Sequence, residues 1–71
     1  MTNHVYAVTE VVGSSPNGLE DAIKNATSTA AKTLHNLEWF EVTEIRGHLN
    51  GDGSIAHYQV DLKLGFRYER K

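Results

Sequence analysis

A tryptophan, a glutamine and an arginine in the second half of the chain have side chains suited to holding a planar ligand. Trp39 is the only tryptophan, and Arg46 and Gln59 follow it in segments whose pattern predicts extended strands. An indole offers a flat π surface, and an amide offers a donor and an acceptor to the edge of a heteroaromatic ring. Together they predict a site for a planar heteroaromatic ligand. The alternative, that Trp39 is an ordinary core or subunit-contact residue, stays open.

The other reactive side chains do not form a catalytic or metal-binding motif. His48 and His57 become neighbours if a hairpin forms around residues 50–53, but the spacing supplies no further ligand for a metal ion. We therefore expect no metal site, and we expect both histidines to be solvated strand residues or oligomer contacts. The serines lack a nucleophile elbow, and residues 13–18 lack the lysine and the glycine spacing of a phosphate-binding loop.

The first half of the chain predicts one strand and one helix. Residues 5–12 are rich in β-branched and aromatic side chains and stop at a glycine, which indicates a strand. Ser15 is predicted as the N-cap of a helix with Pro16 in its first turn, ending near residues 35–36. Spacings of three and four residues place an apolar stripe on this helix, comprising Leu19, Ala22, Ile23, Ala26, Ala30, Leu34 and Leu37. The alanines in the stripe predict a close approach to whatever the helix covers.

The second half of the chain predicts a β-hairpin whose turn is at residues 50–53. Residues 54–70 alternate between apolar and polar side chains, which is typical of a strand with one covered face. The preceding run changes phase, because Phe40 and Val42 share one parity while Ile45 and Leu49 share the other. A β-bulge near residues 43–44 would bring all four onto the helix-covered face and turn Trp39 toward the polar face, with Gln59 and Arg46.

Length and composition predict one domain, residues 1–71, of the α+β class: a three-stranded antiparallel sheet with one helix on one face. The 71 residues contain no cysteine, so neither disulfides nor a thiolate zinc site can stabilise so small a core, and we expect a homo-oligomer. Seven Lys and Arg against nine Asp and Glu argue against nucleic-acid and membrane partners, although Arg67 could hold a phosphate locally. Without a signal-like or membrane-spanning stretch, a cytoplasmic location is expected.

Several segments resemble the dodecin family. They are residues 12–23 (VGSSPNGLEDAI), 37–42 (LEWFEV), 44–47 (EIRG), 58–60 (YQV) and 65–67 (GFR). The resemblance covers nearly the whole chain. It implies a β-α-β-β subunit, assembled as a hollow dodecamer, that binds FMN, or else riboflavin or FAD, and stores it without turnover. It also implies paired isoalloxazine rings at two-fold contacts, sandwiched between tryptophans of two subunits.

The same resemblance assigns residues to the ligand sites. Trp39 corresponds to the stacking indole, Gln59 to the amide at the ring edge, Arg46 to an arginine near the flavin, and Glu44 to an acidic position near the ribityl chain. For coenzyme A, which relatives of this kind also hold, the matching residues are Thr33, Arg67 and Glu69, while Thr29 stands where some relatives have a basic residue. Two other functions stay open: a structural or coenzyme-A-binding oligomer without flavin, and a small flavoenzyme.

Overall fold

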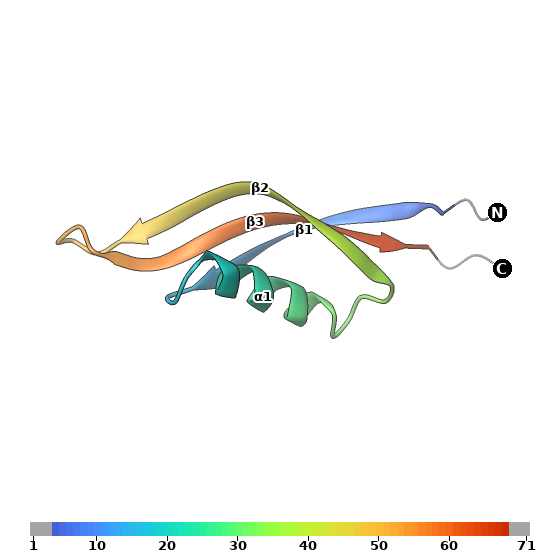
Figure 1. Ribbon diagram of the computed structural model, residues 1–71, viewed down its shortest axis with the longest axis horizontal. Coiled ribbons are helices and arrows are strands. Elements are labelled where there is room, and N and C mark those ends of the chain that lie inside the picture. The colour runs from blue at the N-terminus through green and yellow to red at the C-terminus, as the bar shows by residue number, and fades with distance from the viewer. Residues whose placement is uncertain (1–3, 69–71) are drawn as a thin grey trace.

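A computed structural model describes residues 4–68 of the chain. Its elements, in chain order, are β1 (Tyr6–Ser15), α1 (Leu19–Ala30), β2 (Leu37–Leu49) and β3 (Ile55–Arg67). The three strands form one antiparallel sheet in the order β1-β3-β2, and α1 lies along one face of it (Figure 1). The predicted α+β class and the β-α-β-β order are confirmed.

The last strand occupies the centre of the sheet. β3 pairs with β1 along ten residues, from Tyr6 opposite Arg67 to Ser15 opposite Tyr58, and with β2 through the hairpin. Because β3 is covered by strands on both edges and by the helix on one face, its alternating apolar residues become the core. The exposed hydrogen-bonding edges of the sheet belong to β1 and β2.

The β-bulge predicted near residues 43–44 is present in β2. Val42 pairs with Leu62, whereas Glu44 pairs with Asp61, so Thr43 is the extra residue. Its hydroxyl donates a hydrogen bond of 3.2 Å to the backbone carbonyl of Asp61, which gives the bulge a local anchor. The bulge changes the parity of β2 as predicted, and Trp39, opposite Gly65, lies on the sheet face away from the helix.

The predicted N-terminal boundary of the helix is wrong. The helix begins at Leu19, with Gly18 at the N-cap, and Ser15 is instead the last residue of β1. Ser15 is buried, donates a 2.6 Å hydrogen bond to Asp21 Oδ2 and accepts one of 2.9 Å from the backbone N–H of Asn17. Strand pairing with β3 extends through Ser15, so this residue cannot serve as the helix cap. Its side chain instead ties the end of β1 to the first turn of α1.

The helix also ends earlier than predicted. It stops at Ala30 and is followed by a turn, in which the backbone N–H of Leu34 still donates to the Ala30 carbonyl at 2.9 Å. Asn36 has a φ of 64°, a left-handed conformation that asparagine tolerates better than most residues. It also exchanges hydrogen bonds with the backbone of Arg67, so the connection into β2 is fixed by the end of β3.

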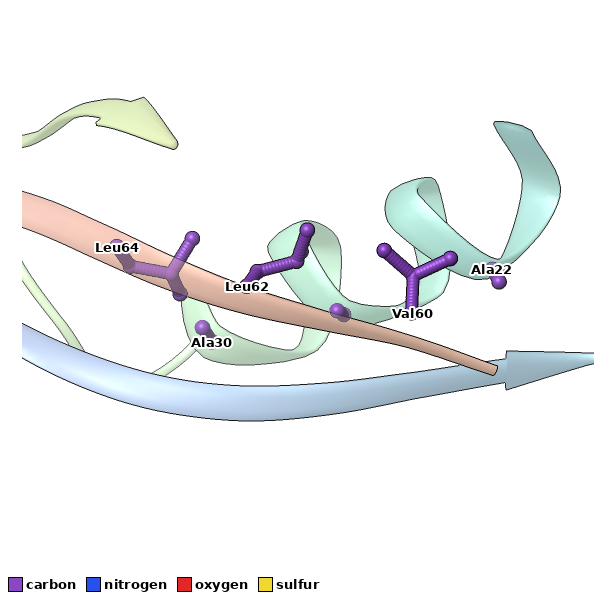
Figure 2. Packing of buried hydrophobic residues seen from close by; sticks show 6 residues of the cluster. Ala22, Ala30, Val60, Leu62 and Leu64 are labelled. Atoms are coloured by element: carbon purple, nitrogen blue, oxygen red, sulfur yellow. The ribbon is translucent and has the colours of Figure 1, made fainter. Parts of the chain in front are cut away.

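The core is small and lies between the helix and β3. Three alanines of α1 pack against three apolar residues of β3 (Figure 2); they are Ala22, Ala26, Ala30, Val60, Leu62 and Leu64. The predicted close approach is confirmed at Gly13, where an added Cβ would meet the Ala22 carbonyl oxygen and lie 2.8 Å from Ala26 Cβ. The glycine in β1 is therefore required by the helix above it.

The helix does not cover β2. It contacts β1 and β3, and although the bulge aligns Phe40 and Ile45 with the core face, they remain 49% and 59% exposed. Of the four residues expected beneath the helix, Val42 packs on the core cluster, while Leu49 is exposed as well. The radius of gyration, 14.9 Å, exceeds the roughly 11 Å typical of a compact chain of this length. The single chain thus leaves apolar surface that a neighbouring subunit can cover.

Candidate functional site

The sheet face away from the helix carries an exposed aromatic surface near the N-terminal end of β2. Trp39 is 40% exposed and leans over β3, where its partner in the ladder is Gly65. The ring of Tyr6, from β1, lies at its side, with 6.2 Å between the ring centroids and 59° between the planes. One face of the indole is therefore turned to the sheet and the other is available for stacking.

A hydrogen-bonded group of three residues supports this aromatic surface. The Tyr6 hydroxyl donates to Glu38 Oε1 at 2.7 Å, and Glu38 Oε2 forms an ion pair of 3.2 Å with Arg67. The hydrogen bond to the carboxylate raises the pKa of Tyr6, so its phenol remains a neutral donor. Sequence reasoning missed Tyr6 and Glu38, because their meeting depends on β1 pairing with β3 and not with β2.

A polar cluster occupies the same face near the hairpin end. Arg46 forms two hydrogen bonds with Asp61, of 3.0 and 2.8 Å, and a further contact of 3.2 Å with Glu44. The hydrogen bonds from Arg46 hold the pKa of Asp61 below its ordinary value, and the same contact raises the pKa of Arg46. Asp61 was not predicted as a site residue, and its polar parity on β3 was the only signal for it.

The Gln59 amide is oriented by its neighbours in this cluster. Its Oε1 accepts a hydrogen bond from Arg46 at 3.1 Å and lies 3.0 Å from His48 Nε2, while its Nε2 donates to the Ser14 hydroxyl at 3.1 Å. With two partners on the oxygen and one on the nitrogen, the amide keeps one N–H for a ligand. The Gln59 amide is therefore oriented to donate a hydrogen bond to a ligand.

The two histidines predicted to be neighbours lie opposite each other in the hairpin. His48 pairs with His57, and their rings stack with 4.6 Å between centroids and 16° between planes. Within residues 4–68 no three histidine or acidic side chains come together as metal ligands. Of the two histidines, only His48 contacts the polar cluster, through Gln59.

The predicted flavin residues share one face but fall into two groups. Glu44, Arg46 and Gln59 are brought together, whereas Trp39 lies opposite Gly65. Gly65 is six residues from Gln59 along β3, which corresponds to about 20 Å at the rise of an extended strand. The interpretation that Trp39 lies beside Gln59 and Arg46 is thus not met within one chain.

Two of the three predicted coenzyme A residues line one recess. Thr33 and Arg67 border a depression of about 280 Å³ between the helix-to-β2 connection and the end of β3. Thr33 also borders a groove of about 470 Å³ between β1 and α1, which Thr29 lines as well. Glu69 lies outside the described residues. Arg67 already has the Glu38 carboxylate as a partner, so an anionic ligand must compete with it.

In the described portion of the chain the one helix, α1, is too short and too polar to span a bilayer.

Comparisons with known proteins agree on one family. The family model described as Dodecin matches residues 5–69. A curated dodecin of Thermus thermophilus is 52% identical over 65 residues, which cover 92% of this chain and 93% of that protein. The solved dodecin of Streptomyces davaonensis is 56% identical with a TM-score of 0.91, covering 97% of this chain and all of that one. The dodecin structure from Streptomyces coelicolor has the same identity and TM-score, and the match covers both chains completely.

Proposed function

This chain belongs to the dodecin family, and from that premise we propose that it is a flavin-binding and storage protein that assembles as a hollow homododecamer and holds FMN at contacts between subunits. The observation that carries the proposal is the arrangement of the free sheet face. A half-exposed indole lies over Gly65, and the Gln59 amide of the polar cluster lies on the same face, six residues or about 20 Å away along β3. One ring can meet both only where two copies of this face adjoin.

Trp39 supplies stacking and quenching in this proposal. The isoalloxazine ring of FMN is planar and electron-poor, so its face packs well on the outward face of an indole. An electron-rich indole in van der Waals contact can donate an electron to the excited flavin and return it to the ground state. The bound flavin is thereby protected from photochemistry, and its fluorescence is quenched.

The polar cluster supplies the contact with the ring edge. Gln59 has one free N–H, which suits a carbonyl oxygen of the flavin. Arg46 orients the Gln59 amide by donating a hydrogen bond to it, and the charge of Arg46 is balanced by Asp61. The role of Arg46 is therefore to position Gln59 more than to attract a phosphate. Glu44 extends the cluster with a 70% exposed side chain, which can accept hydrogen bonds from ribityl hydroxyls.

The proposal assigns binding without turnover. Stacking and edge hydrogen bonds need neither a base nor a nucleophile. The three residues of this face with shifted pKa values, Tyr6, Arg46 and Asp61, are shifted toward the protonation states that they have at neutral pH. A store of this kind fits the expected cytoplasmic location. A flavoenzyme would need room for a substrate beside the ring, which stacked rings do not leave.

Coenzyme A is a second candidate ligand. The supporting observation is that Thr33 and Arg67 border the same recess, at the opposite end of β3 from the polar cluster. Because Arg67 is paired with Glu38, a diphosphate competes with that carboxylate for the guanidinium. Coenzyme A is therefore expected to bind more tightly to Glu38→Gln than to the unaltered protein.

Titration of the purified assembly with FMN tests the main proposal. We expect saturable loss of flavin emission, flavin absorption bands that co-migrate with the protein in size-exclusion chromatography, and a mass near twelve subunits. A colourless assembly that leaves FMN emission unchanged would support the structural or coenzyme-A-binding alternative. Steady oxidation of a reduced nicotinamide by the FMN-loaded protein would support the flavoenzyme instead.

A further inference from the structure

Gly65 lies directly beneath the Trp39 indole. The two residues are partners in the β2–β3 ladder, and a Cβ added to Gly65 would fall into the ring, against Cε2, Cζ2 and Cδ2 of Trp39. Gly65 is buried even though Lys63, its neighbour on the same face, is exposed. The indole is therefore what covers Gly65, and the missing side chain is what allows the ring to lie on the backbone.

The need for glycine here does not arise from the backbone conformation. Within residues 4–68, the residues with positive φ angles are Gly18, Asn36 and Gly53, and Gly65 is not among them. Its requirement is a close approach, as at Gly13 beneath the helix. An alanine at position 65 can adopt the strand conformation but cannot share the space with the ring in its observed position.

Neighbouring side chains limit where the indole can move. Tyr6 lies at its side, and the Tyr6 hydroxyl is fixed by Glu38, which is fixed in turn by Arg67. An outward movement, away from the sheet, avoids both the Gly65 backbone and the Tyr6 ring. A methyl group at position 65 would therefore lift the ring into the space that a stacked ligand needs.

We propose that Gly65 is a positioning residue for the flavin: it lets Trp39 lie flat on β3, so that one indole face is presented to the ligand in a fixed orientation before binding. This inference rests on the proposed function for its ligand, whereas the indole position can be tested without any ligand. A ring already held in its binding orientation loses less conformational freedom when a flavin stacks on it. Lifting it is expected to raise the dissociation constant for FMN about tenfold, the scale of one aromatic stacking contact.

The test compares Gly65→Ala with Gly47→Ala as its matched control. Gly47 is also a strand glycine, but a Cβ there would meet only the His57 carbonyl oxygen, at 3.7 Å. Because Trp39 is the only tryptophan, its emission maximum and near-ultraviolet circular dichroism report the ring directly in ligand-free protein. We expect Gly65→Ala to shift both signals and weaken FMN binding, and Gly47→Ala to change neither. Unaltered tryptophan spectra and unaltered FMN affinity in Gly65→Ala would overturn the proposal.

Thermal unfolding of the double variant separates positioning from a general packing defect. If the ring is what forbids a side chain at position 65, Gly65→Ala lowers the unfolding temperature of the parent protein. In the Trp39→Ala background the same substitution should not lower it, because the ring is gone and alanine at position 65 restricts the unfolded chain more than glycine does. An equal loss in both backgrounds contradicts the assignment. Should the parent protein fail to quench FMN at all, the proposed function fails, while the ligand-free spectra and this cycle still decide the position of the ring.

Discussion

Arg46 and Asp61 are joined across the hairpin by two hydrogen bonds of 3.0 and 2.8 Å, and the extra residue Thr43 lies between this contact and Trp39 in β2. Arg46 pairs with Gln59 on the turn side of the bulge, so without the extra residue Trp39 would have the opposite parity and lie on the face of Val60 and Leu62. The bulge therefore places Trp39 on the same face of the sheet as the polar cluster. Each prediction below tests one part of this arrangement.

Asp61 is expected to make stability depend on acidic pH. Folding lowers its pKa, so the contribution of the Arg46 contact is complete above the ordinary value of 3.8 and is lost as the pH falls through the lower folded value. Asp61→Asn should lower the urea midpoint at pH 7 and narrow the difference between the midpoints at pH 7 and pH 3. Glu20→Gln is the control, since its pair with Lys24 is highly exposed and should contribute little. If the urea midpoints of Asp61→Asn at pH 7 and pH 3 differ by as much as those of the parent protein, the prediction is contradicted.

Trp39 is expected to control both FMN affinity and quenching. Trp39→Ala removes the stacking surface and should weaken FMN binding at least about tenfold while leaving the assembly intact. Trp39→Phe keeps an aromatic face but a poorer electron donor, so FMN should bind and retain more of its emission. Fluorescence lifetimes of bound FMN measure this directly. Equal quenching in the parent and the alanine variant would reject the indole as the electron donor.

Gln59 is expected to act as a hydrogen-bond donor to the flavin. Gln59→Glu replaces the free N–H with a carboxylate oxygen, which repels a flavin carbonyl, and should weaken FMN binding about tenfold at pH 8. Gln59→Leu should also weaken binding, but the loss should not vary with pH. Calorimetric titration of FMN into each assembly provides the affinities. Parent-like affinity in Gln59→Glu would show that the amide does not donate to the ligand.

Gly13 is expected to be required for packing of the helix on β1. Gly13→Ala places a methyl group against the Ala22 carbonyl and 2.8 Å from Ala26 Cβ, an overpacking that should cost about 1–3 kcal/mol in the free energy of unfolding. At Gly51, in the hairpin turn, no atom lies within 4 Å of an added Cβ, so Gly51→Ala should be close to neutral. Denaturant unfolding compares the two. A neutral Gly13→Ala would mean that the helix can shift freely on the sheet.

Ile45 is expected to lie in a subunit contact. It is 59% exposed on the core side of β2, beyond the reach of the helix, and a charge there should prevent burial against another copy. Ile45→Asp should reduce the mass measured by sedimentation, whereas Gly51→Asp adds the same charge in the open hairpin turn and should not. A full-sized assembly of Ile45→Asp would place the contact elsewhere.

Patterns local in the sequence determined the parts of the fold that depend on parity and spacing. The alternation of residues 54–70 specified the core residues Val60, Leu62 and Leu64, and the phase change between Val42 and Ile45 specified the bulge and hence the face of Trp39. Parity depends only on consecutive residues of one strand, so it can be predicted without knowing which other segments pair with that strand. The family motifs added the expected ligand and the candidate residues.

The remaining features were decided by tertiary structure, because they depend on competition between distant segments. Ser15 satisfies the local rule for a helix cap, but pairing with Tyr58 keeps it in β1. The Tyr6–Glu38–Arg67 group exists only because β3 lies between β1 and β2. The distance between Trp39 and Gln59 follows from the ladder register, and this register separates the two parts of the proposed flavin site within each chain.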